Sequence, residues 1–196
     1  MLRPSRALAL GAGERLDGPL GPVEDEHWAP DHIVLARRVL TRAGRLFVER
    51  DATGLVLQRS PLEDMAAVEQ RYPAWARGPF GRIEPEFTLP DRPGVYALVS
   101  DGVVRYVGAS EDLERTFGPR HGLGHISRRD CTNRRQEEPC RLNRLITADA
   151  VAGRIVDLYL LELERRRWYG GRSGDGPAAV AAEIVAAVRG EWHLPE

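Results

Sequence analysis

The 196-residue sequence predicts an α+β protein: a small, mainly antiparallel central sheet flanked by helices, with an N-terminal β-rich extension. Two β-branched runs, Val95 to Val99 and Val103 to Val107, flank an Asp-Gly pair. They predict a β-hairpin, because Asp-Gly tolerates the positive φ angles of a tight turn. A third apolar run, residues 155–163, predicts a further strand of this sheet.

The first 89 residues predict an arm and an extension. Residues 1–30 are rich in Gly, Pro and acidic residues and predict a flexible or irregular arm. In the extension, residues 32–40 fit either a strand or one short helix. Residues 44–50 and 54–59 flank Asp-Ala-Thr and predict a second hairpin.

A helix follows in the extension. Ser60 fits the N-cap, Pro61 the first helical position, and Glu63 completes a capping box. We expect this helix to run to about Arg71, since Pro73 stops it. The Pro/Gly-punctuated stretch beyond it predicts irregular chain. The extension could pack on the main domain, contact DNA or form a dimer element.

Three helices are predicted after the hairpin formed by residues 95–107. Residues 111–117 should form a helix capped by Ser110 and ended by Gly118-Pro119. Residues 141–151 should form the next helix, with apolar side chains on one side. The Ala/Val-rich residues 177–188 should form the last, before Gly190.

Composition narrows the class of protein. A hydrophobic content of 42% and a charged content of 29% suit a soluble globular protein with a sizeable core. The net charge of −1 argues neither for nor against a nucleic-acid partner. All 28 basic residues are arginine, which excludes a Schiff-base or P-loop lysine and favours bidentate phosphate contacts. A codon bias toward Arg, Ala and Gly would give the same composition.

The cysteines and the apolar runs indicate in which cellular compartment the protein is expected. Cys131 and Cys140 are too few for a disulfide scaffold or a Cys-only zinc site, and we expect reduced thiols in a cytoplasmic protein. A zinc site that also uses His121 and His125 is the alternative. No apolar run approaches the roughly 18–20 residues that span a bilayer, so no membrane partner is expected.

The loop of the hairpin decides where Tyr96 and Tyr106 point. A two-residue turn at Asp101-Gly102 would pair Tyr96 with Val107 and put the two rings on opposite faces. A three-residue loop, with Gly102 left-handed, would pair Tyr96 with Tyr106 on one face, and a bulge could do the same. The residues themselves allow either register.

The hairpin and the residues after it contain Gly94-Val95-Tyr96, Tyr106-Val107-Gly108, Ser110, Asp112-Leu113 and Arg115. Two such tripeptides, followed by Asp-Leu-x-Arg, resemble the signature of the GIY-YIG nuclease superfamily. Residues 123–131 and 140–146 are similar to a stretch of some bacterial and phage members, so the resemblance covers about residues 90–196. It favours the register with both tyrosines on one face. With the arm (1–30) and the extension (31–89) predicted from composition and local patterns, a GIY-YIG-like domain (90–196) is the third part.

The resemblance implies a divalent-metal-dependent DNA endonuclease that uses Mg²⁺ or Mn²⁺. Phosphodiester hydrolysis needs a base for water and cationic help for the phosphoryl group. In the family, the first tyrosine is proposed as the base, and the second tyrosine and the arginine orient water or stabilise the phosphate. These roles fall on Tyr96, Tyr106 and Arg115. A phenol with a pKa of about 10 needs a nearby cation to act as a base near neutral pH.

Two further site residues are suggested by the resemblance. Some members place a histidine shortly after the arginine, and His121 is the nearest candidate, ahead of His125. The family's metal ligand is a glutamate in a Glu-x-x-Leu-Ile pattern followed by Pro-x-Trp-Asn. Aligning residues 190–193 with that ending puts Ala181 at the carboxylate position. Glu183, the candidate catalytic and metal-binding acid, lies about 200° further round the helix. Glu162 or Glu164 could replace it.

Residues 119–146 form a basic stretch. Seven arginines against three acidic residues give a local excess of +4. Beside a nuclease site, such a stretch predicts a phosphate-contacting face. The candidate nucleic-acid-binding residues are Arg120, Arg128, Arg129, Arg134, Arg135, Arg141 and Arg144. The alternative to an endonuclease is a non-catalytic nucleic-acid-binding module on the same scaffold.

Overall fold

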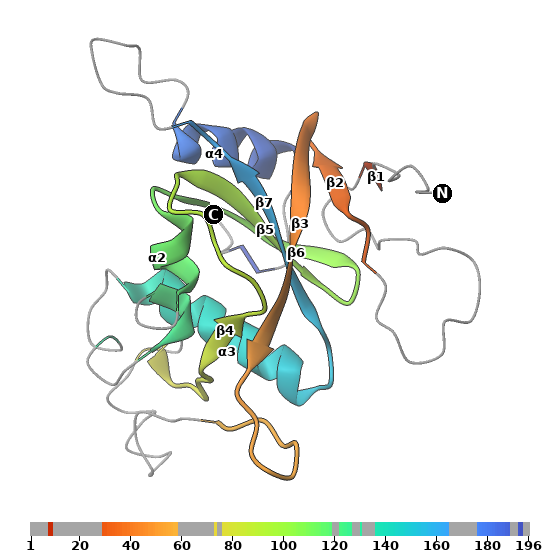
Figure 1. The fold of residues 1–196 in the computed structure, drawn as a ribbon. Helices are drawn as coiled ribbons and strands as arrows, with labels where there is room; N and C mark the ends of the chain where they lie inside the picture. The colour runs from red at the N-terminus through yellow and green to blue at the C-terminus, as the bar shows by residue number, and fades with distance from the viewer. Residues whose placement is uncertain are drawn as a thin grey trace, which may run out of the picture. The chain divides into compact units, whose positions relative to one another are not determined.

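The computed structural model describes two compact units, and each is treated by itself. The described residues are 8–9, 29–58, 73, 76–118, 122–126, 130, 136–164, 176–188 and 192–193. The first unit comprises the described parts of residues 1–45, 90–113 and 155–196, and the second those of residues 46–89 and 114–154. The fold is α+β, as predicted, with a mainly antiparallel sheet (Figure 1).

Among the described residues, the sheet has the strand order β1-β2-β3-β7-β5-β6, with β4 paired to β3 (Figure 1). Strand β1 is parallel to β2, whereas β2–β3, β3–β4, β5–β6 and β5–β7 are antiparallel. The strands are β1 (Leu8–Ala9), β2 (His32–Leu35), β3 (Arg38–Val48), β4 (Ile83–Pro85), β5 (Gly94–Ser100), β6 (Val103–Ser110) and β7 (Val156–Glu162). The helical segments are α2 (Leu113–Phe117), η2 (Gly122–Gly124), α3 (Glu137–Val151) and α4 (Pro177–Ala187).

The tyrosine hairpin combines a two-residue turn with a bulge. Asp101 and Gly102 have φ angles of 50° and 74° and connect the terminal pair Ser100 and Val103. The register then shifts, because Val99 pairs with Val104 whereas Leu98 pairs with Tyr106, which makes Arg105 the extra residue. The bulge places both tyrosines on one face, as expected. Tyr96 itself lies opposite Gly108.

The other face of the hairpin forms the core of the first unit. Val95, Ala97 and Val99 alternate with the tyrosine-face residues and pack against α4. Strands β2 and β3 contribute to the same core. Its buried members are Ile33, Leu35, Leu40, Val95, Ala97, Val99, Val104, Val107, Tyr159, Val180, Ala181, Ile184 and Val188. Residues from both sides of position 90 therefore share one hydrophobic core.

A buried ion pair joins β3 to β7 in the same unit. Arg42 donates to Asp157 Oδ1 from Nε at 3.2 Å and from Nη2 at 2.8 Å. Asp157 is only 1% exposed, so the pairing compensates for the loss of its hydration. Tyr159 lies two residues further along β7 and donates its hydroxyl proton to the carbonyl of Pro30 at 2.9 Å. Burial, and then the negative charge of Asp157, raise the pKa of Tyr159 well above its ordinary value.

The raised pKa of Tyr159 predicts a loss of stability at high pH. The unfolded chain releases this proton above pH about 10, whereas the folded protein keeps it. The contribution of the hydroxyl is therefore fully present below pH 10 and decreases by about 1 kcal/mol by pH 11. Urea unfolding of wild type and Tyr159→Phe at pH 8 and pH 11 measures this decrease. An equal stability difference between the two proteins at both pH values would contradict it.

A buried asparagine organises the second unit. Asn143, on α3, is fully buried and donates from Nδ2 to the carbonyls of Gly81 and Leu123, both at 2.8 Å. Its Oδ1 accepts from the backbone N–H of Gly81 at 3.1 Å. One side chain thus ties the segment before β4 and the turn η2 to α3. Nearby in this unit, the side chain of Cys140 is buried with those of Ala76 and Phe80.

Several predicted elements need correction or completion. Residues 32–40 form β2 and the start of β3, which decides the alternative in favour of strand. The hairpin predicted from residues 44–50 and 54–59 is confirmed in part: its first strand is the end of β3, but the described part of the second is reduced to one antiparallel bridge, Arg50 to Val56. The stretch before residue 90 contains the short strand β4. The helix predicted at 60–71 lies outside the described residues, as does the arm apart from β1 and residues 29–30.

One side chain closes the turn that this bridge encloses. Asp51 Oδ1 accepts hydrogen bonds from the N–H and hydroxyl of Thr53 and from the N–H of Leu55. Gly54 has a φ of 86°, which completes a compact turn. The hydrogen bond from Thr53 and the others lower the pKa of Asp51 below its usual value.

Candidate functional site

Tyr96 and Tyr106 form an aromatic pair on the face of the hairpin opposite α4. Their ring centroids are 5.9 Å apart and their planes are inclined by 38°. Each residue is 4% exposed. The rings lie close to Gly108, where an added Cβ would be 2.5 Å from Tyr96 Cζ, 2.6 Å from its Oη and 2.7 Å from Tyr106 Cε1. Glycine at position 108 therefore lets the two rings approach the strand.

Replacing Gly108 by alanine should displace the tyrosine rings. A methyl group at these distances forces both aromatic side chains to move, and overpacking of this kind costs about 1–3 kcal/mol. We expect changed tyrosine ring signals in NMR spectra and a lower urea midpoint. Gly176→Ala is the control, because its Cβ would meet nothing within 4 Å. Wild-type ring signals in Gly108→Ala would show that the close approach is not required.

The C-terminal segment joins this pair. Trp192 donates its backbone N–H to the carbonyl of Arg105 at 2.8 Å, beside β6. The next residue, His193, accepts at Nε2 a hydrogen bond from the N–H of Val107 at 3.0 Å. Its ring stacks on Tyr106 with centroids 4.5 Å apart and an interplanar angle of 22°. Sequence reasoning did not select His193, although it occupies the position of the final Asn in the family's Pro-x-Trp-Asn ending.

Arg115 belongs to the second unit, whereas both tyrosines belong to the first. It lies near the end of α2 and is exposed. Exposure suits a guanidinium that binds phosphate, because the group can reach a ligand from solvent. The expected meeting of Arg115 with the tyrosine pair stays a prediction.

The structure does not bring Glu183 to the tyrosines. Helix α4 packs its Val180, Ala181 and Ile184 on the face of the hairpin that lacks the tyrosine rings. Glu183 follows Ala181 by about 200° round the helix, so its side chain points outward. It accepts a hydrogen bond from Arg38 Nη2 at 2.8 Å and its side chain is 55% exposed. Ala181, the position aligned with the family's carboxylate, is buried in the core.

The described residues do not fit a magnesium site. No group of three or more His, Cys, Asp or Glu side chains within this part of the chain could hold a metal ion. The alternative acid Glu162 is half-exposed and lies 3.8 Å from Arg92 Nη1. The zinc alternative is likewise without support here, since Cys140 is enclosed by apolar side chains. Its possible partners His121 and Cys131 lie outside the described residues.

The basic stretch is described only in part. Both Arg141 and Arg144 lie on α3, where Arg141 is 8% exposed and Arg144 is partly buried. Neither offers DNA a fully exposed guanidinium in this structure. The candidates outside the described residues are His121, Arg120, Arg128, Arg129, Arg134 and Arg135. The phosphate-binding role of these arginines and the catalytic role of His121 stay predictions.

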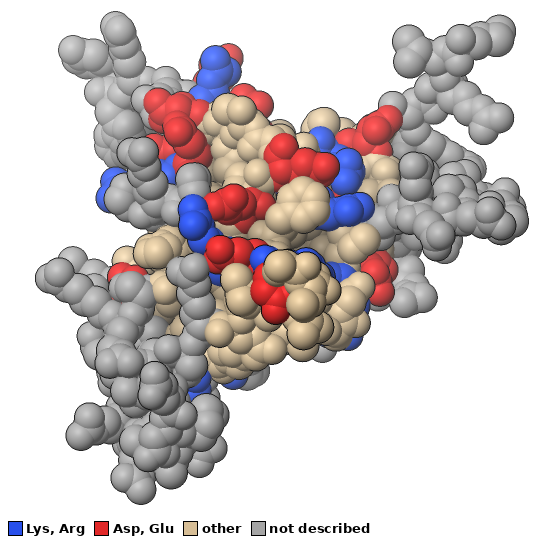
Figure 2. Space-filling model, turned by 60° about the horizontal axis from the view of Figure 1, so that its bottom comes forward, with Lys and Arg blue, Asp and Glu red and all other residues tan. Residues whose placement is uncertain are grey.

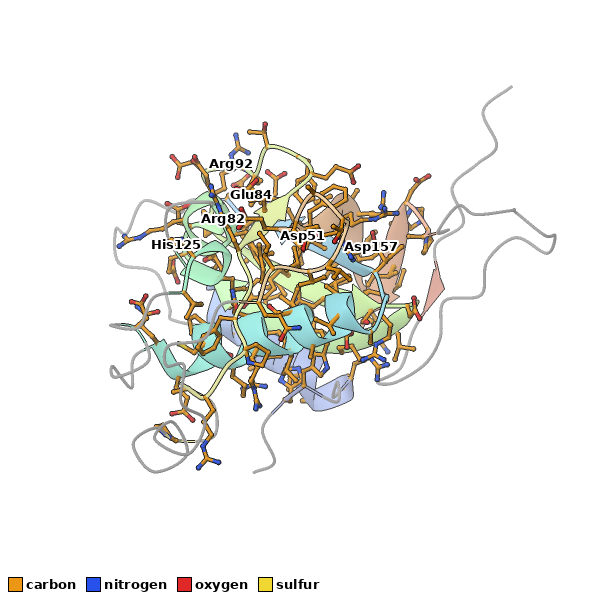
Figure 3. The ribbon with its side chains drawn as sticks, turned by 90° about the horizontal axis from the view of Figure 1, so that it is seen from below. Asp51, Arg82, Glu84, Arg92, His125 and Asp157 are labelled. Carbon is orange, nitrogen blue, oxygen red and sulfur yellow. The ribbon has the colours of Figure 1, made fainter. Side chains whose placement is uncertain are left out.

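Charges of opposite sign are interspersed among the described surface residues. On the face shown in Figure 2, acidic and basic side chains lie next to one another. In the second unit, Arg82 Nη2 lies 2.9 Å from Glu84 Oε1, and both residues are labelled in Figure 3. Exposed ion pairs of this kind contribute about 0–1 kcal/mol each.

Among the residues that the structure describes, none of the helices has both the length and the hydropathy of a membrane span.

Comparisons with known proteins assign no family. The chain matches no family model, no curated protein and no solved structure. Function is therefore inferred from the contacts above and from the motif resemblance.

Proposed function

We propose that the chain is a DNA endonuclease of the GIY-YIG type that hydrolyses phosphodiester bonds at the Tyr96–Tyr106 pair. The observation that carries this proposal is the packing of the two tyrosines on one face, over Gly108. The two tripeptides of the motif are thereby in contact, as a shared site requires. Since each tyrosine is 4% exposed, the proposal also requires that this small exposed area include the phenol oxygens.

The proposed chemistry is hydrolysis by water. The phenolate of Tyr96 takes a proton from water while the water oxygen bonds to phosphorus and the ester P–O bond breaks. The oxygen released from phosphorus takes a proton from solvent and leaves as an alcohol. Tyr106 orients the water through its hydroxyl. Arg115 donates to the phosphate oxygens and offsets the charge that develops on them.

The resemblance to the family leads us to expect a divalent metal ion in the proposed site. Mg²⁺ or Mn²⁺ would stabilise the phosphoryl charge and lower the pKa of a bound water. Because no cluster of described acidic side chains could hold the ion and Glu183 is paired with Arg38, no step above is assigned to the ion. A cytoplasmic location stays a prediction in the same way.

A nucleic-acid-binding module that does not cut is the second candidate function. It is favoured by the position of Glu183, whose carboxylate is paired with Arg38 away from the tyrosine face. The buried Ala181 occupies the position where the family has its acid. A site that keeps the tyrosines and arginine but lacks the acid would retain phosphate binding and lose cleavage.

Supercoiled plasmid separates the two candidates. With Mg²⁺ or Mn²⁺, an endonuclease yields nicked or linear DNA, and EDTA stops the reaction. Arg115→Ala should abolish cleavage, whereas Arg92→Ala, another exposed arginine, should keep it. Retarded plasmid that stays intact in every metal would support the binding module. If the protein neither cleaved nor retarded the plasmid, both functions would be contradicted.

Glu183→Ala tests the acid separately. Metal-dependent cleavage that is unchanged in this variant would remove Glu183 from the mechanism, as its ion pair with Arg38 indicates. Lost cleavage with an unchanged urea midpoint would restore it as a metal ligand.

A further inference from the structure

We propose that His193 is the positioning residue of the Tyr96–Tyr106 site, a role that rests on the proposed nuclease function. One imidazole makes two different contacts with β6: its ring stacks on Tyr106, and its Nε2 accepts the N–H of Val107. It therefore holds both the second tyrosine of the motif and the strand that carries it.

The stacking contact restricts the ring of Tyr106. With centroids 4.5 Å apart and planes 22° from parallel, the imidazole covers one region of the phenol ring. Tyr96 contacts the same phenol at a centroid distance of 5.9 Å. Tyr106 thus touches an aromatic side chain from β5 and another from the C-terminal segment, which limits the rotamers open to it.

The hydrogen bond fixes where the imidazole lies. Strand β6 ends the order of the described sheet, and the N–H of Val107 points away from β5 toward the C-terminal segment. Because Nε2 accepts this bond, it carries no proton, and the neutral ring has its proton on Nδ1. The adjacent bond from Trp192 N–H to the Arg105 carbonyl anchors the backbone beside the same strand.

This arrangement predicts a role in turnover more than in binding. A shift of the Tyr106 hydroxyl by a fraction of an ångström changes its alignment with water and phosphate, which lowers kcat. His193 itself lies beside the strand and is not assigned a contact with DNA, so KM should change little. A side chain that only stabilised the fold would instead lower the amount of active protein.

Three substitutions in the full-length chain separate the two contacts. His193→Phe keeps an aromatic ring and loses the acceptor, His193→Asn keeps an acceptor oxygen and loses the ring, and His193→Ala loses both. NMR measures the exchange rate of the Val107 amide and the ring signals of Tyr106, while plasmid nicking gives kcat and KM. Arg92→Ala, a surface change in the same unit, is the control.

We expect His193→Ala to increase the exchange rate of the Val107 amide about tenfold, the equivalent of one lost hydrogen bond. The same variant should shift the NMR signals of the Tyr106 ring and lower kcat about 10- to 100-fold. His193→Asn should restore slow exchange of the Val107 amide, and His193→Phe should restore the wild-type signals of Tyr106. Wild-type exchange and ring signals in His193→Ala would overturn the proposal, whatever the nuclease assay shows. Changed signals in a protein whose wild type never cuts DNA would instead overturn the nuclease function and leave the anchoring intact.

Discussion

Tyr96→Phe should reduce plasmid nicking by about 10²- to 10⁴-fold, the contribution expected of a general base. The change removes one oxygen and leaves the ring that packs over Gly108 and against Tyr106. We therefore expect an unchanged fold and an unchanged KM for DNA. Initial nicking rates and the urea midpoint, measured on the same preparation, check both parts of the prediction.

Tyr159→Phe is the matched control, because it removes the same oxygen from another buried tyrosine of the first unit. Its hydroxyl bonds the Pro30 carbonyl, so its loss should cost about 1 kcal/mol of stability and leave the nicking rate unchanged. If both variants lost activity in proportion to stability, Tyr96 would be a structural residue. Full activity in Tyr96→Phe would exclude it as the base.

Asn143→Asp should be the most destabilising single change in the second unit. The amide nitrogen donates to two buried carbonyls, and a carboxylate would place negative charge against those same oxygens. Leaving these backbone groups without their partner costs about 1–3 kcal/mol each, so we expect a loss of at least about 2 kcal/mol at pH 7, to which the buried charge adds. Urea unfolding followed by circular dichroism measures it.

Asn143→Ala separates the charge from the lost hydrogen bonds. It removes the donor and acceptor without adding charge, so at pH 7 it should be the more stable of the two variants. Folding raises the pKa of an aspartate in this environment, and the gap should narrow as the pH falls and the acid is protonated. An Asp variant as stable as wild type would show that Asn143 does not tie these segments together.

The hairpin could be predicted because its signals are local. Asp101-Gly102 set the turn, and the β-branched runs set the strands. The face shared by Tyr96 and Tyr106 could not be derived from these residues. A turn with a bulge at Arg105 and a longer loop give the same face, and only the pairing register distinguishes them.

Contacts between segments far apart in the chain could not be predicted from the sequence for a different reason. Val107 and His193 are 86 positions apart, and nothing in either segment indicates that one bonds the other. The pairing of Arg42 with Asp157 across β3 and β7 is equally invisible in a linear pattern. By contrast, helical geometry alone predicted that Glu183 points away from the aligned Ala181 position, and the structure agrees.

The most direct test of the account is a crystal structure of Tyr96→Phe bound to a DNA duplex. The account predicts a backbone phosphate within about 3 Å of both the Tyr106 hydroxyl and the Arg115 guanidinium, the distance of a hydrogen bond. DNA bound at a surface remote from Tyr106, or Arg115 directed away from the phosphate nearest that hydroxyl, would contradict it.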